Sequence, residues 1–185
     1  LEKSAFHYTF QTFSSRDGLP NDEVQALLQD SMGYIWIGTR AGLYRYDGYS
    51  VKTFANNLAH PDRFTSNYIY TLAEDRQNRL WIGTENGLNI MDLTTGHIRK
   101  IIFRGERGYN IIRSLLCDRR GNMWIGTDAA LLFCAAGDDR FRRLSAVERW
   151  GDLPRGSVHS LWEARSGRVY IGTWGAGLYC YDPSE

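Results

Sequence analysis

Short segments in which apolar and polar residues alternate recur along the whole chain, separated by turn-forming glycine and aspartate. This alternation has a period of two, which is typical of half-buried β-strands and not of helices. In each unit an alternating segment leads to a tetrapeptide anchor, which a second alternating segment follows. The anchor reads WIGT at Trp36, Trp81 and Trp124 and YIGT at Tyr170. After three of the four anchors a further short segment follows, so one unit predicts four short antiparallel strands.

The anchors recur at steps of 45, 43 and 46 residues. A period of about 40–50 residues that contains four short antiparallel strands is typical of a propeller blade. The sequence therefore predicts an all-β fold, a β-propeller built from four four-stranded blade repeats. The expected blade repeats cover residues 24–54, 69–103, 112–144 and 158–182.

The two ends of the chain are uneven. Residues 5–13, AFHYTFQTF, predict an outer strand without a blade of its own, and the last unit lacks its fourth strand. We therefore expect the last blade to be completed by this N-terminal strand or by another chain, which removes exposed sheet edges. Three arrangements stay open: a closed ring of four blades, an eight-bladed ring of two chains, and a fragment of a longer propeller. We favour the fragment for the natural protein.

The aromatic residue of each anchor is expected to pack between adjacent blades, because it recurs at one position of the second strand. The isoleucine that follows it, such as Ile82 after Trp81, must face the other side of the sheet. Apolar residues on both faces are consistent with a neighbouring blade on each side. Asp30, Asp75 and Asp118 recur six residues before the anchors, and we interpret them as turn residues rather than as a carboxylate cluster.

Composition and charge exclude some classes of partner. The chain has 185 residues, with 14% aromatic residues, 19 glycines and a formal net charge of +1. Such a charge provides no general attraction to nucleic acid or to an anionic membrane. No apolar run approaches the roughly 18 residues that span a membrane. We therefore expect no nucleic-acid partner and no membrane contact by this region itself.

The three cysteines, Cys117, Cys134 and Cys180, are widely spaced and form no CxxC pair. This spacing does not indicate a zinc site or a redox pair, and it leaves open one disulfide with one free thiol. Cys134 and Cys180 occupy strand positions where other units have apolar residues, so we expect both to be small buried hydrophobic side chains. We expect no metal and no cofactor.

No arrangement typical of catalysis is found. The histidines lie far apart, and none has a metal-ligand spacing. His159 and Ser160 are adjacent in a predicted strand, which directs their side chains to opposite faces. The histidines are His7, His60, His97 and His159. The innermost strands offer mainly Gln25, Gln29, Glu74, Arg113, His159 and Glu163. We therefore predict no catalytic residue and no enzymatic activity.

Candidate ligand-binding residues lie in the loops that join blades and in those that join the second and third strands, since both sets emerge on one face. The repeat fixes the geometry of these tips but leaves their residues variable, which is typical of binding positions. The candidates are Arg40, Glu85, Asn86, Asp128, Trp150 and Trp174. Exposed indoles beside arginine and carboxylates suit a glycan. A packing role stays open for the two indoles: Trp150 would hold a loop against a blade, and Trp174 would fill a bulge.

The stretch DGLPNDEVQALLQDSMGYIWIGTRAGLYRYDG resembles the two-component regulator propeller repeat. The resemblance covers essentially the whole chain, although the third unit has Ala130 and Ala135 in place of the turn glycine and closing aspartate. The fourth unit has Tyr170 in place of tryptophan and one extra residue in GTWGAGL. In that family the repeats form periplasmic propellers that precede an immunoglobulin-like domain, a membrane helix and a cytoplasmic histidine kinase. The usual signals are oligosaccharide breakdown products.

The resemblance implies a non-catalytic, ligand-sensing region of a two-component signalling receptor. It implies an extracytoplasmic, periplasmic location and an oligosaccharide or other small extracellular ligand. A homodimer of the chain is a further expectation. Two alternatives stay open because fold does not determine function: a protein-interaction scaffold, and a propeller lyase or glycosidase with catalytic groups around the central channel.

Overall fold

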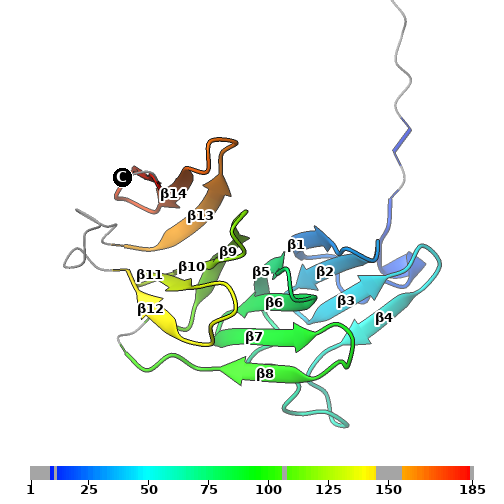
Figure 1. The fold of residues 1–185 in the computed structure, drawn as a ribbon. Helices are drawn as coiled ribbons and strands as arrows, with labels where there is room; N and C mark the ends of the chain where they lie inside the picture. The colour runs from blue at the N-terminus through cyan, green and yellow to red at the C-terminus, as the bar shows by residue number, and fades with distance from the viewer. Residues whose placement is uncertain (1–8, 11, 106–107, 145–155, 184–185) are drawn as a thin grey trace, which may run out of the picture.

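The computed structural model describes residues 9–10, 12–105, 108–144 and 156–183. In these residues the chain forms four antiparallel sheets that follow one another in chain order (Figure 1). One turn of 3-10 helix, η1 (Ser15–Asp17), is the only helical element of the described residues. The architecture confirms the predicted all-β propeller repeats. Within the described residues, no helix is long and apolar enough to cross a membrane.

Each sheet, called a blade below, has its strands in the order of the chain. The first blade consists of β1 (Val24–Gln29), β2 (Ile35–Thr39), β3 (Leu43–Tyr46) and β4 (Val51–Phe54). The second consists of β5 (Ile69–Glu74), β6 (Arg79–Thr84), β7 (Gly87–Asp92) and β8 (Ile98–Ile101). The third consists of β9 (Ile112–Cys117), β10 (Met123–Thr127), β11 (Leu131–Cys134) and β12 (Phe141–Arg143). The fourth consists of β13 (Val158–Glu163), β14 (Val169–Thr173) and β15 (Leu178–Tyr181).

The turn between the first two strands of a blade is organised by one aspartate. In the second blade, Oδ1 of Asp75 accepts hydrogen bonds from the backbone N–H groups of Gln77 and Arg79, and Oδ2 accepts one from the indole of Trp81. The same indole bond joins Trp36 to Asp30 and Trp124 to Asp118. The three aspartates therefore have the structural role that the sequence predicts. The fourth blade has Ala164 and Tyr170 at these positions, so the acceptor and the indole donor are replaced together.

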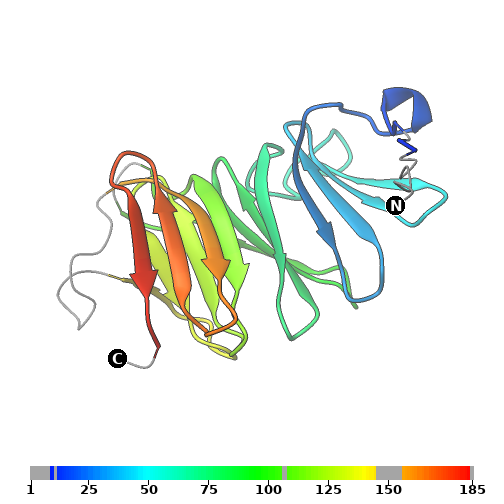
Figure 2. The same ribbon diagram turned by 90° about the horizontal axis from the view of Figure 1, so that it is seen from above.

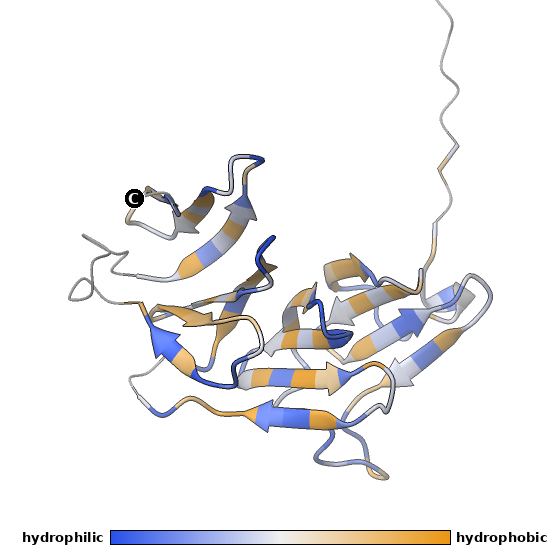
Figure 3. Cartoon of the chain, in the orientation of Figure 1, coloured by the Kyte–Doolittle hydropathy of each residue, from blue (hydrophilic) through white to orange (hydrophobic). Residues whose placement is uncertain are grey.

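The three anchor tryptophans pack between blades, as predicted, whereas Tyr170 of the fourth anchor is half-buried and lies beside Trp162, with 5.8 Å between the ring centroids. Trp81 is 1% exposed and lies in one apolar cluster with Ile112, Met123 and Ile125 of the following blade. The same arrangement repeats at the junctions on either side, with Trp36 and Trp124. Apolar and polar residues alternate along the strands (Figure 3). Ile125 faces away from Trp124, and both side chains are buried. Both faces of the third blade are therefore covered by its neighbouring blades.

The blades form an open arc. The innermost strands β1, β5, β9 and β13 lie side by side in that order, and the first and fourth blades lie at opposite ends of the arc (Figure 2). A closed ring of four blades, one of the three arrangements considered above, is therefore not what the described residues form. The predicted outer strand over 5–13 falls largely outside the described residues, and Thr9, Phe10, Thr12 and Phe13 have no strand conformation.

Both ends of the arc expose apolar positions that are buried at the internal blade junctions. Leu178 of the fourth blade is 70% exposed, whereas its equivalents Leu43, Leu88 and Leu131 are 1% exposed or less. At the other end Val24 is 41% exposed, and its equivalents are 0% exposed. Those equivalents are Ile69, Ile112 and Val158. The surfaces at the two ends of the arc are therefore equivalent to the two surfaces that pack against each other at every internal blade junction.

All three cysteines are free thiols, so the disulfide considered above does not form. Cys134 is buried, as expected, and Cys117 is half-buried. Burial raises the pKa of both thiols. Cys180 is exposed, and the expectation of a buried residue is wrong there. The reason is that its side of β15 faces away from the third blade, and no further described blade covers it.

Candidate ligand-binding face

One face of the arc carries a β-bulge at the start of every innermost strand. In the third blade Ile112 pairs with Thr127 and Ser114 with Gly126, which leaves Arg113 without a partner. The other three blades have the same irregularity. The bulged residues are Gln25, Tyr70, Arg113 and His159. A bulge redirects a side chain away from the regular alternation, so four equivalent positions present side chains of different chemistry at the same end of neighbouring strands.

The glycine of the anchor allows the innermost strands to approach one another. A Cβ atom at Gly126 would lie 2.6 Å from the carbonyl oxygen of Val158 in the next blade. A Cβ atom at Gly83 would lie 2.7 Å from Cγ2 of Ile112, again in the next blade. Any side chain at these positions would push the blades apart. The anchor glycine thus brings the bulged residues of adjacent blades together.

The anchor threonine fixes the loop that carries the predicted binding positions. Oγ1 of Thr84 donates to the carbonyl of Gly87 at 2.8 Å and accepts the N–H of Asn86 at 3.1 Å. Thr39 and Thr127 make both kinds of bond in their own loops, and Oγ1 of Thr173 donates to the carbonyl of Gly177. The loop is also tied to the segment that enters the blade, since the N–H of Glu85 donates to the carbonyl of Tyr68. Tips of variable sequence are therefore held on a constant backbone.

Arg40 begins a row of contacts across this face. Its guanidinium lies 3.1 Å from Glu23 and 5.0 Å from the ring centroid of Tyr68, in the entry to the second blade. The rings of Tyr68 and Tyr70 are 4.5 Å apart. Arg113 of the third blade lies 4.4 Å from the centroid of the Tyr70 ring. Cation–π contacts thus link three blades in sequence.

Arg113 continues this row to the fourth blade. Its Nε and Nη2 donate to the two carboxylate oxygens of Asp128 at 2.7 and 2.9 Å. The hydroxyl of Ser157 donates to the same carboxylate at 2.6 Å. His159 lies near this carboxylate and beside Trp174, with 5.5 Å between the ring centroids and a tilt of 34° between the ring planes. We refer to Arg40, Tyr68, Tyr70, Arg113, Asp128, His159 and Trp174 as the recognition row.

The charges in the recognition row are paired. Hydrogen bonds from Arg113, followed by one from Ser157, hold the pKa of Asp128 below its usual value, against an opposing effect of burial. The same contact with Asp128 raises the pKa of Arg113. Contacts with Tyr68 and Glu23 raise the pKa of Arg40. Burial raises the pKa of Tyr70, and the nearby charge of Arg113 partly opposes this. Each guanidinium in the row is therefore accompanied by a carboxylate.

Three of the predicted binding residues, Arg40, Asp128 and Trp174, belong to the recognition row. Glu85 and Asn86 are exposed at the equivalent tip of the second blade. Trp150 lies outside the described residues. Sequence reasoning did not single out Tyr68, Tyr70 or Ser157 for binding, and it considered Arg113 and His159 only as weak catalytic candidates. A usable signal exists: the residue after the first apolar residue of each innermost strand varies from blade to blade.

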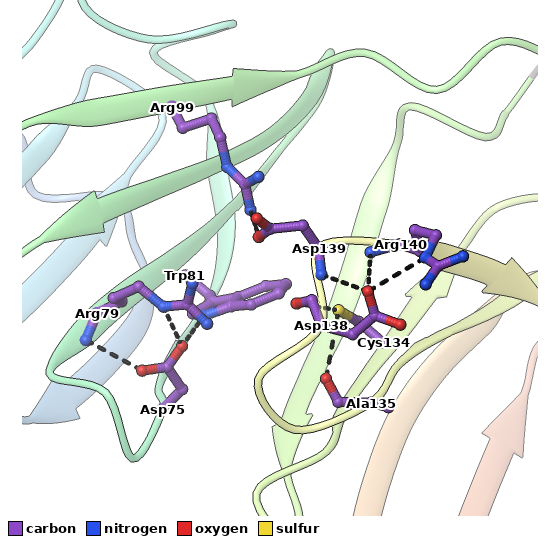
Figure 4. Close-up of polar contacts among 9 residues, drawn as sticks. All are labelled: Asp75, Arg79, Trp81, Arg99, Cys134, Ala135, Asp138, Asp139 and Arg140. Atoms are coloured by element: carbon purple, nitrogen blue, oxygen red, sulfur yellow. Dashed lines mark hydrogen bonds and ion pairs between the residues drawn. The ribbon is translucent and has the colours of Figure 1, made fainter.

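The opposite face is occupied by structural contacts between blades. Figure 4 shows the second and third blades there, with Arg99 paired to Asp139 at 2.8 Å and Asp75 holding Arg79 and Trp81. A groove of about 260 Å³ lies between the third and fourth blades on this side. Its lining includes Arg119, Arg120, Glu163, Arg165 and Tyr181. Arg119 bridges this junction, because its N–H donates to Glu163 and its guanidinium donates to the carbonyl of Arg165.

The described residues contain no group of three or more His, Cys, Asp or Glu side chains placed to hold a metal ion. The recognition row combines aromatic rings with charged hydrogen-bonding groups. Such a surface can stack on a ring-shaped ligand and exchange hydrogen bonds with its hydroxyl groups.

Comparisons with known proteins support this architecture. A family model described as "Two component regulator propeller" matches residues 18–41, 63–86 and 105–129, which belong to the first three blades. Histidine kinase P4 of Formosa agariphila is 37% identical over 57 residues, which are 31% of this chain and 4% of that protein.

Solved structures share the fold. The extracellular domain of the hybrid two component system BT3049 of B. thetaiotaomicron matches with a TM-score of 0.78 at 21% identity, over 95% of this chain and 25% of that one. The extracellular domain of BT4673 of B. thetaiotaomicron matches with a TM-score of 0.72 at 27% identity, over 91% of this chain and 22% of that one. The chain thus spans about a quarter of these structures.

Enzymes occur among the structural neighbours as well. Virginiamycin B lyase from Staphylococcus aureus matches with a TM-score of 0.64 at 13% identity, over 89% of this chain and 57% of that one. At this identity the likeness concerns the fold alone, so it assigns no reaction to this chain.

Proposed function

Because three of the four blades carry the two-component regulator propeller repeat, we propose that this chain is part of the extracytoplasmic, ligand-sensing region of a two-component signalling receptor. In this proposal it lies in the periplasm, binds an oligosaccharide and catalyses no reaction. Ligand occupancy would be passed to the rest of the receptor through the propeller. The extracellular domains among its structural neighbours support the location and the sensing role.

The recognition row is the observation that carries the proposal. Four aromatic side chains, Tyr68, Tyr70, His159 and Trp174, lie among arginine and carboxylate groups on one face. Trp174 is 77% exposed, so its indole is available to a ligand. Sugar rings present C–H groups that pack on aromatic faces and hydroxyl groups that bond to charged side chains. This row is therefore better suited to an oligosaccharide than to an apolar ligand.

The proposal is tested by titrating the chain with plant and host oligosaccharides in a calorimeter. We expect at least one glycan to bind, and we expect the double variant Arg40→Ala, Trp174→Ala to lose that binding. The control is Tyr49→Ala, Arg120→Ala, which removes an exposed aromatic residue and an exposed arginine elsewhere on the chain. If the double variant binds the glycan with wild-type affinity, the recognition row is not the binding site. Turnover of a glycan during the titration would favour the lyase or glycosidase alternative.

A further inference from the structure

We propose that Gln25, Tyr70, Arg113 and His159, the four bulged residues of the innermost strands, determine ligand specificity and select uncharged oligosaccharides over acidic ones. This inference rests on the proposed function, because it specifies which oligosaccharides the recognition row accepts.

Packing constrains the neighbours of each bulged residue but not the residue itself. The preceding position is a branched aliphatic residue in all four blades, and it is 0% exposed in three of them. The following position is small, and the four residues there are Ala26, Thr71, Ser114 and Ser160. Between them stand glutamine, tyrosine, arginine and histidine, of which the first and last are exposed. A fixed backbone with a variable side chain is the arrangement expected of residues that read a ligand.

The four bulged residues are close enough to act on one ligand. The strands that carry them lie next to one another along one side of the arc (Figure 1). Arg113 contacts the ring of Tyr70 across the junction of the second and third blades, and it contacts Asp128, which Ser157 of the fourth-blade entry also bonds. A chain of several sugar units that lies across the arc would therefore meet successive bulged residues.

The charges of the recognition row disfavour an acidic ligand. The Nε and Nη2 edge of Arg113 is occupied by both carboxylate oxygens of Asp128, which is the geometry that a uronate or sulfate group would need. Arg40 is likewise paired with Glu23. An acidic ligand would have to displace Asp128 or lie beside its negative charge. Hydroxyl groups of an uncharged sugar can instead bond to the amide of Gln25 and the imidazole of His159.

The test uses matched tetrasaccharides that differ only in oxidation at C6: glucose against glucuronic acid, galactose against galacturonic acid, and mannose against mannuronic acid. Binding is measured by calorimetry with the wild-type chain, with Gln25→Ala and His159→Ala, and with Asp128→Asn. The control is Arg120→Ala on the opposite face. Thermal melting of each variant verifies that it is folded.

We expect an uncharged tetrasaccharide to bind at least about tenfold more tightly than its acidic counterpart. The reason is that a carboxylate of the acidic ligand would lie beside the carboxylate of Asp128. Gln25→Ala and His159→Ala should each weaken that binding about fivefold. Asp128→Asn should reduce the difference in affinity between the uncharged and the acidic tetrasaccharide of a pair, because it strengthens binding of the acidic one. Equal or tighter binding of the acidic member by the wild type, or unchanged affinity in both alanine variants, overturns the inference and leaves the proposed function intact. Absence of binding by every tetrasaccharide of the set and of the wider panel overturns the proposed function itself.

Discussion

The indole Nε1 of Trp81 donates a 2.7 Å hydrogen bond to Oδ2 of Asp75, six residues earlier in the chain. The other oxygen of the same carboxylate accepts hydrogen bonds from the turn between β5 and β6. One aspartate therefore links this turn to the tryptophan that packs between two blades. Both side chains are buried, and the bond repeats in the first and third blades. The aspartate and the tryptophan that recur six residues apart thus form a single structural device, with glycine at the turn in the first and third blades and Asn78 there in the second.

We expect Trp81→Ala to lower the free energy of unfolding by about 3–5 kcal/mol, because it removes a buried aromatic side chain and leaves a cavity between two blades. The measurement is chemical denaturation followed by circular dichroism. Trp174→Ala is the matched control, since it removes an exposed indole and should change stability by less than about 0.5 kcal/mol. An unchanged melting temperature in Trp81→Ala would refute the packing role.

We also expect Gly126→Ala to destabilise the chain, by about 1–3 kcal/mol, because the added Cβ meets both Ser114 and the carbonyl of Val158. Gly172→Ala provides the comparison. Its Cβ would meet Ser160 of its own blade, and no atom of a further blade lies near it among the described residues. The loss in Gly126→Ala should therefore be larger in the same denaturation experiment. Equal losses would mean that the glycine does not serve the approach of the next blade.

The fold could be predicted from the sequence because each blade repeats the same local chemistry. Two-residue alternation gives the strands, the aspartate gives the turn, and the recurring tryptophan gives the junction, so four copies confirm one another. The repeat pattern leaves three arrangements of the blades open, and the exposure of Cys180 could not be predicted in this way. Both depend on whether a further blade packs on the last one, and a repeat pattern describes only what is shared among units.

The candidate site could be predicted only in part. Arg40, Asp128 and Trp174 of the recognition row are predicted as candidates, because the loop between the second and third strands is easily located from the anchor. Tyr70 and Arg113 of the recognition row are not predicted from the sequence, because strict alternation assigns them to a regular strand. The bulge interrupts that alternation for one residue. It leaves no glycine or proline in the sequence to mark it, so only the comparison of equivalent positions would have revealed it.

The contact between Arg113 and Asp128 predicts a specific pH dependence. The folded pKa of Asp128 lies below its unfolded value of about 3.9. As the pH falls, the unfolded state binds the proton first, so the stabilising contribution is complete above about pH 5 and is lost as the pH falls through the folded pKa. We expect the difference in melting temperature between wild type and Asp128→Asn to shrink between pH 7 and pH 3. The control is Asp62→Asn, which removes an exposed carboxylate in the loop after β4. A difference in melting temperature from the wild type that stays constant with pH for both variants would contradict this prediction.

The ends of the arc predict self-association. Leu178 and Trp162 are exposed at one end, and Val24 and Leu27 at the other. Their equivalents meet at every internal junction, where the leucine side of one blade packs on the aliphatic side of the next. We propose that two copies of the chain pair head to tail, so that each end of one arc covers the opposite end of the other. Each junction then joins two different surfaces, one from each copy, and the ring closes when both junctions form.

Light scattering of the chain at increasing concentration measures this association. We expect a mass of twice 21.2 kDa for the wild type and a monomer for Leu178→Asp, because an unpaired carboxylate in an apolar junction opposes burial. Leu58→Asp is the matched control, since Leu58 is fully exposed in the loop after β4 and far along the chain from either end surface. Cys180 provides an independent measurement, because it lies on the same exposed strand as Leu178. Its alkylation should be slow in the wild type and in Leu58→Asp, and fast in Leu178→Asp. A wild-type chain that stays monomeric, with Cys180 alkylated equally fast in all three proteins, would show that the two ends do not recognise each other.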